Sequence, residues 1–158
     1  MEKRLETVIP GSKGLGFLGE AARLPGVLIL GIGPYTCLRG LFFSFYHENL
    51  EHKLFCLPIS TWDFAAGIQV ELAEQDIRQL IETERPRAIL IYTSCSDLLV
   101  STGYERMAKV VEQETGVWID VLKRGSLSLG KMTPKERFQK ILARWEEKGI
   151  YAKGGRGR

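Results

Sequence analysis

The chain has 158 residues, a size that suits one domain with a single hydrophobic core. Its composition, with 44% hydrophobic and 26% charged residues, is that of an ordinary soluble protein, and its net charge of +3 is too weak to indicate a nucleic-acid partner. No apolar run reaches the roughly 18 residues that a membrane helix needs, and the charged start lacks the apolar core of a signal peptide, so we expect a cytoplasmic protein.

The first half of the chain alternates apolar runs with helical patterns. Residues 27–32 form a continuous apolar run between glycines, which is typical of a strand buried on both faces, and a helix is predicted over 35–47. A second strand is predicted over 53–57. Apolar residues at helical spacing then predict a helix over 70–84, which ends before Pro86.

The second half of the chain repeats this alternation. Residues 88–92 (AILIY) are the clearest strand in the sequence. Residues 102–105 have the spacing of a capping box, which predicts a helix that ends before a fourth strand at 117–122. A second capping box at 133–136, with proline at the first helical position, predicts a helix that closes at Gly149.

Strands that alternate with helices predict an α/β fold. We expect one three-layer, Rossmann-like domain over residues 1–150, with a mainly parallel four-stranded sheet. Residues 151–158 are basic and glycine-rich, and we expect a solvated tail there. A basic arm that contacts an acidic partner or RNA is the alternative for this tail.

Three cysteines in a chain without a signal peptide indicate free thiols, metal ligands or redox chemistry. Ligands of parallel sheets bind beyond the carboxyl ends of the strands. Cys37 follows the first predicted strand and Cys95 the third, so we expect both thiols close together at one edge of the sheet. Either cysteine alone would be explained as a small residue at a tight turn. Cys56 lies inside the second predicted strand, where we expect it to be buried as a small hydrophobic residue.

The turns that carry the two cysteines have a recognisable pattern. Gly33 and Pro34 precede Cys37, and Ser94 precedes Cys95 in a loop rich in threonine and serine. This pair of turns resembles the nitrogenase component 1 family, which has a glycine–proline turn before one cysteine and a Thr/Ser-rich loop around another. Weaker similarities follow in the same order along nearly the whole chain, at residues 11–14, 60–67 and 125–130. Family members commonly carry a further cysteine in the first of these segments, and this chain has none there.

The resemblance implies an iron–sulfur cluster between subunits, with Cys37 and Cys95 as metal ligands and Gly33, Pro34 and Ser94 beside the cluster. A [4Fe–4S] cluster normally takes four thiolates, so two chains would each supply two. The partner chain would be a second copy or a family-related subunit. The resemblance also implies an ATP-dependent reductase of the nitrogenase iron-protein type as electron donor.

The hypothesis is therefore a small redox protein, an oxidoreductase component if it is catalytic and an electron relay if it is not. One alternative is a cluster-assembly or scaffold module without catalysis of its own, and another is a Rossmann-like small-molecule binder with incidental cysteines. Arg39 would either neutralise cluster charge or form a surface ion pair, and His47 and His52 are expected in a solvated turn. Aromatic residues are expected in the core or at a dimer interface: Phe42, Phe43, Phe45, Trp62 and Phe64.

Overall fold

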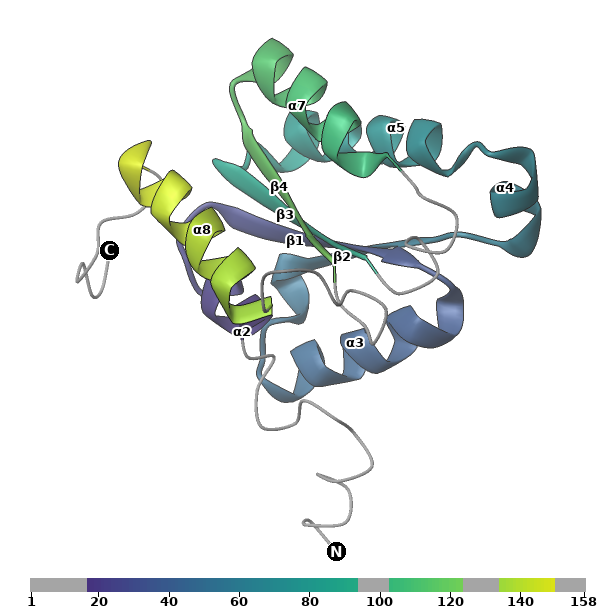
Figure 1. The fold of residues 1–158 in the computed structure, drawn as a ribbon. Helices are drawn as coiled ribbons and strands as arrows, with labels where there is room; N and C mark the ends of the chain where they lie inside the picture. The colour runs from purple at the N-terminus through teal and green to yellow at the C-terminus, as the bar shows by residue number, and fades with distance from the viewer. Residues whose placement is uncertain (1–16, 94–102, 124–133, 150–158) are drawn as a thin grey trace, which may run out of the picture.

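Four parallel strands form the centre of the molecule (Figure 1). The computed structural model describes residues 17–93, 103–123 and 134–149. The strands are β1 (Val27–Gly33), β2 (Leu54–Pro58), β3 (Ala88–Thr93) and β4 (Trp118–Lys123). They are ordered β2-β1-β3-β4, and all three pairings are parallel. The predicted α/β, Rossmann-like class is confirmed, and none of the helices in these residues is long and apolar enough to cross a membrane.

Helices cover both faces of the sheet, which is why the two central strands are continuous apolar runs. Every residue of β1 is buried, and Ile29 and Leu90 are fully enclosed in the core. One face carries α2 (Phe17–Ala22), α3 (Tyr35–His47) and α8 (Pro134–Glu147). The other face carries α4 (Thr61–Ala66), α5 (Gln69–Glu84) and α7 (Tyr104–Thr115). A short 3₁₀ turn, Glu51–Lys53, joins α3 to β2.

Side-chain capping defines the start of one short helix in the described residues. Helix α7 begins at Tyr104, and Thr102, the cap residue of the predicted box at 102–105, lies outside the described residues. A capping box does occur at α4, where Ser60 Oγ accepts from the Asp63 N–H at 3.1 Å. The Asp63 carboxylate accepts from the Ser60 N–H at 2.8 Å, and hydrogen bonding from the backbone and then the side chain of Ser60 lowers the pKa of Asp63.

A glycine in β1 sets how closely α3 packs on the sheet. A Cβ atom at Gly31 would lie 2.8 Å from Leu41 Cδ2 and 3.1 Å from Leu38 Cδ2, both on α3. Real side chains do not approach so closely without displacing their neighbours. Gly31 therefore lets α3 lie against the sheet, and this packing fixes the position of the first turn of α3, which contains Cys37.

Candidate functional site at the carboxyl edge of the sheet

The topological switch point of the sheet lies between β1 and β3. From β1 the chain crosses to β2 on one side, and from β2 it returns past β1 to β3 on the other side. The direction of the connections thus reverses between β1 and β3, and ligands of open α/β sheets bind beyond the carboxyl ends of the strands at such a point. Ile32 pairs in register with Thr93, so the carboxyl ends of β1 and β3 lie side by side.

Cys37 lies at this switch point, in the first turn of α3. Its N–H donates to the Pro34 carbonyl oxygen at 3.0 Å, and its side chain is exposed. Pro34 is extended (φ −60°, ψ 146°) and has no side chain that can accept from the first amides of α3. The positive end of the helix dipole therefore lies beside the thiol, without a side-chain acceptor from the cap. The Cys37 sulfur is thus presented at the surface of the carboxyl edge of the sheet.

The second predicted ligand, Cys95, lies outside the residues that the structure describes, as do Ser94 and Ser96. What is described is the end of β3, two residues earlier. Thr93 is fully buried, and its hydroxyl has no hydrogen-bond partner within the described ranges. Strand alternation directs Thr93 toward the face of α5 and α7, opposite to α3, because Ile91 packs on that face.

The prediction for Cys56 is wrong in one part. Cys56 does lie within β2, but its side chain is exposed. The reason is that β2 is the outermost strand, with a neighbour on one side only, so the covering helices do not enclose its middle. The atoms that do surround its sulfur still raise the pKa of the Cys56 thiol. Within the described ranges, no group of three or more His, Cys, Asp or Glu side chains is placed to hold a metal ion.

The other residues near Cys37 lie at the surface. Tyr35 and Thr36 are exposed beside it on the first turn of α3. The Arg39 guanidinium lies 6.0 Å from the centre of the Phe43 ring, and the described residues offer it no ion pair. The predicted surface ion pair of Arg39 is thus not found in that part of the chain.

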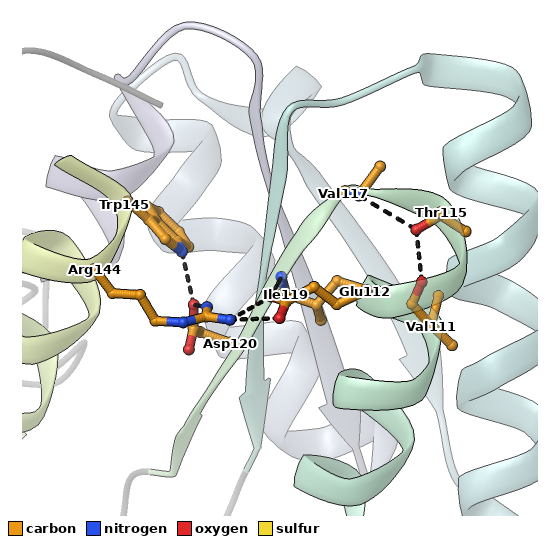
Figure 2. A network of polar contacts seen from close by, with 8 residues as sticks. All are labelled: Val111, Glu112, Thr115, Val117, Ile119, Asp120, Arg144 and Trp145. Atoms are coloured by element: carbon orange, nitrogen blue, oxygen red, sulfur yellow. Dashed lines mark hydrogen bonds and ion pairs between the residues drawn. The ribbon is translucent and has the colours of Figure 1, made fainter. Parts of the chain in front are cut away.

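Sequence reasoning missed a polar network at the opposite edge strand, β4 (Figure 2). One guanidinium nitrogen of Arg144 on α8 donates to both carboxylate oxygens of Glu112 on α7, at 2.6 and 2.5 Å. The other nitrogen donates to Asp120 Oδ2 on β4 at 2.5 Å, and Trp145 Nε1 donates to the same oxygen at 2.7 Å. Glu112 also accepts from the Ile119 N–H at 2.9 Å. We call these residues the Arg144 clasp, because they join helices on opposite faces across the edge of the sheet.

The Arg144 clasp is structural. Asp120 pairs in register with Leu90, in the middle of β4 and away from the carboxyl edge. Desolvation raises the pKa of Asp120 and outweighs the opposing effect of the neighbouring Arg144. A signal was present in the sequence, since Asp120 interrupts the apolar run of the fourth strand. Its partners lie 24 and 25 residues further along the chain, so no local pattern identifies them.

Comparisons with known proteins give a likeness at the level of the fold. No protein-family model matches the sequence, and no curated protein matches it. A solved structure, "Nitrogenase Cp1 at pH 6.5", is similar with a TM-score of 0.54 at 18% identity, over 63% of this chain and 21% of that chain. The chain therefore spans about a fifth of the length of that structure. What this chain shares with nitrogenase Cp1 is therefore the fold, over the 63% of this chain that the similarity covers.

Proposed function

We propose that this chain is a small nitrogenase-like redox protein that binds an iron–sulfur cluster at the carboxyl edge of its sheet, with Cys37 and Cys95 as ligands. The observation that carries the proposal is the position of Cys37, exposed on the first turn of α3 at the point where the strand order reverses. A thiolate at a helix N-terminus is a suitable ligand for an iron–sulfur cluster. Cys95 is the second residue after β3 in the sequence, and β3 is the other strand that borders the same switch point.

Two thiolates per chain fit half of a [4Fe–4S] cluster. A second chain must supply the other two ligands, and we propose a second copy or a related subunit at this edge. Gly33 and Pro34 bring the backbone to the edge, and Ser94 is placed by its sequence position to donate a hydrogen bond to the cluster. Such a cluster supplies one-electron transfer, and the electrons would come from an ATP-dependent reductase of the nitrogenase iron-protein type.

The fold-level likeness to nitrogenase Cp1 supports this function over a generic small-molecule binder. Electron relay is the role we propose for such a cluster. A second candidate is a scaffold or cluster-assembly module that binds the cluster at the same edge and passes it on without electron transfer. Reduction of the bound cluster by a reductase and ATP separates these two roles.

The test is anaerobic reconstitution of the full chain with ferrous iron and sulfide. We expect a brown protein with an absorption band at about 400 nm, where thiolate-to-iron charge transfer occurs. Cys37→Ala and Cys95→Ala should each lose this colour and the bound iron. Cys56→Ala is the matched control, since Cys56 is also exposed but lies on the edge strand, and it should keep both. A colourless wild type, or equal iron in all three variants, would contradict the proposal.

A further inference from the structure

Helix α3 has two apolar sides, and only one of them packs against the sheet. Leu38 and Phe45 are buried against β1 and β2. The adjacent side, centred about a quarter turn around the helix from Leu38 and Phe45, presents four large aromatic side chains to solvent: Tyr35 (69% exposed), Phe42 (45%), Phe43 (45%) and Tyr46 (59%). The largest contiguous apolar patch on a protein surface often marks a contact site, and the apolar side chains of a helix normally face a neighbour.

The exposed side chains form a regular stripe. Tyr35, Arg39, Phe42 and Tyr46 are separated by four, three and four residues, which is the spacing of a helix-pairing seam. The Phe42 ring stacks on Tyr46 with centroids 6.3 Å apart and meets Phe43 edge-on at 6.1 Å. The rings thus already form one continuous surface along the helix. We call these five residues the α3 stripe.

The order of residues in the α3 stripe is nearly the same in both directions. Tyrosine stands at each end, and Arg39 and Phe42 occupy the two middle positions of the seam. In an antiparallel pair of α3 helices, Tyr35 would face Tyr46 of the second copy and Arg39 would face Phe42 of the second copy. This arrangement is self-complementary, since it sets each guanidinium against an aromatic ring and keeps the two guanidinium groups apart. The α3 stripe contains no carboxylate that would attract a basic partner.

We propose that the α3 stripe is a homodimer interface, on which a second copy of this chain docks with its own α3 antiparallel. Each of the four aromatic side chains of the α3 stripe has a surface of about 200 Å² and is roughly half exposed. Together they would bury on the order of 400 Å² of side-chain surface per copy. A stable interface buries about 800 Å² per partner, so the α3 stripe supplies its apolar centre and the surrounding surface the remainder.

This contact is separate from the proposed cluster. Cys37 lies two residues after Tyr35, about 200° further around the helix, so its thiol does not share the α3 stripe. One chain can therefore contact a second copy through α3 and another subunit through the carboxyl edge. The inference does not rest on the proposed function, and it is tested on metal-free protein.

The test is sedimentation of the metal-free, reduced full chain over a range of micromolar concentrations. We expect wild type and Cys37→Ala to be dimeric. Phe42→Lys places a positive charge against Arg39 of the second copy, whereas Phe42→Glu places an opposite charge there. The dimer of the lysine variant should therefore have a dissociation constant more than about tenfold higher than that of the glutamate variant, because like charges at an interface repel. Both variants should keep the far-ultraviolet circular dichroism of wild type, since Phe42 is outside the core.

The control variant is Trp62→Glu, which removes the most exposed aromatic side chain that the structure describes outside α3 (84% exposed). It should leave the dimer intact. A monomeric wild type would overturn the proposal, and so would equal weakening by the two Phe42 variants, because loss of apolar area alone does not depend on the sign of the charge. Dissociation by Trp62→Glu to the same extent as by Phe42→Lys would also overturn it.

Discussion

Replacing Arg144 by methionine should destabilise the fold far more than breaking the exposed ion pair between Arg78 on α5 and Glu114 on α7. Methionine keeps an apolar stem that packs near Trp118, whose ring centre lies 4.6 Å from the guanidinium carbon. It removes the only cation that the described residues place in contact with both Glu112 and Asp120. Their side chains are 14% and 19% exposed, so two largely buried carboxylates would lose their charge partner.

The size of the effect follows from burial. Breaking a fully buried ion pair costs about 3–5 kcal/mol, because a buried charge is left uncompensated. Fully exposed pairs contribute about 0–1 kcal/mol. The Arg144 side chain is 33% exposed, which places the expected loss between these limits, at about 2–3 kcal/mol. For a domain of this size the melting temperature should then fall by roughly 5–10 °C.

Urea denaturation followed by circular dichroism measures this loss directly. The matched control is Arg78→Met, because Arg78 contacts Glu114 of the same helix at 2.6 Å but with 38% and 55% of the two side chains exposed. The control should unfold at the same urea concentration as wild type, within error. Equal shifts in the two variants would refute the reasoning, since the two contacts have nearly the same length and differ mainly in exposure.

Three further predictions concern folding. Gly31→Val should destabilise the domain by about 1–3 kcal/mol, because its side chain would overlap Leu41 of α3, and urea denaturation measures the loss. Gly40→Ala should instead stabilise it by about 0.5–1 kcal/mol in the same assay, because Gly40 lies in the middle of α3 and a Cβ there would meet no atom within 4 Å. The raised pKa of Asp120 means that folding favours its protonated form. Its contribution to stability is therefore fully present below the ordinary carboxyl value of 3.8 and is lost as the pH rises through the raised pKa. Asp120→Asn should remove this decline from denaturation curves measured at several acidic pH values, whereas a decline of unchanged size would assign it to another group.

The strands and long helices could be predicted because their signals are local. A strand covered on both faces is a continuous apolar run, which is why residues 27–32 and 88–92 were identified within one residue of β1 and β3. The bounds of α3 are those predicted. The predicted second strand starts one residue early because Lys53 completes the preceding 3₁₀ turn. Helix α2 was missed, since its six residues are too few for a helical period to be visible.

The features that were missed depend on distant parts of the chain. Whether Cys56 is buried depends on the place of β2 in the sheet order, and an edge strand and a central strand can have the same local sequence. The Arg144 clasp joins residues 32 positions apart in the case of Glu112. The candidate site could be located from sequence because parallel strands all present their carboxyl ends at one edge, so Cys37 needed no long-range information to be placed there.

The Arg144 clasp also decides which side of the sheet other chains can reach. The N–H of Ile119 points away from β3, toward the outer margin of β4, and Glu112 occupies the place where an incoming strand would form its first hydrogen bond. Arg144 and Trp145 hold α8 across the same margin (Figure 2). A nascent chain in which this contact has not yet formed presents β4 as a template for intermolecular strand addition. The time at which α8 docks on β4 during synthesis therefore determines how long the chain is prone to aggregate.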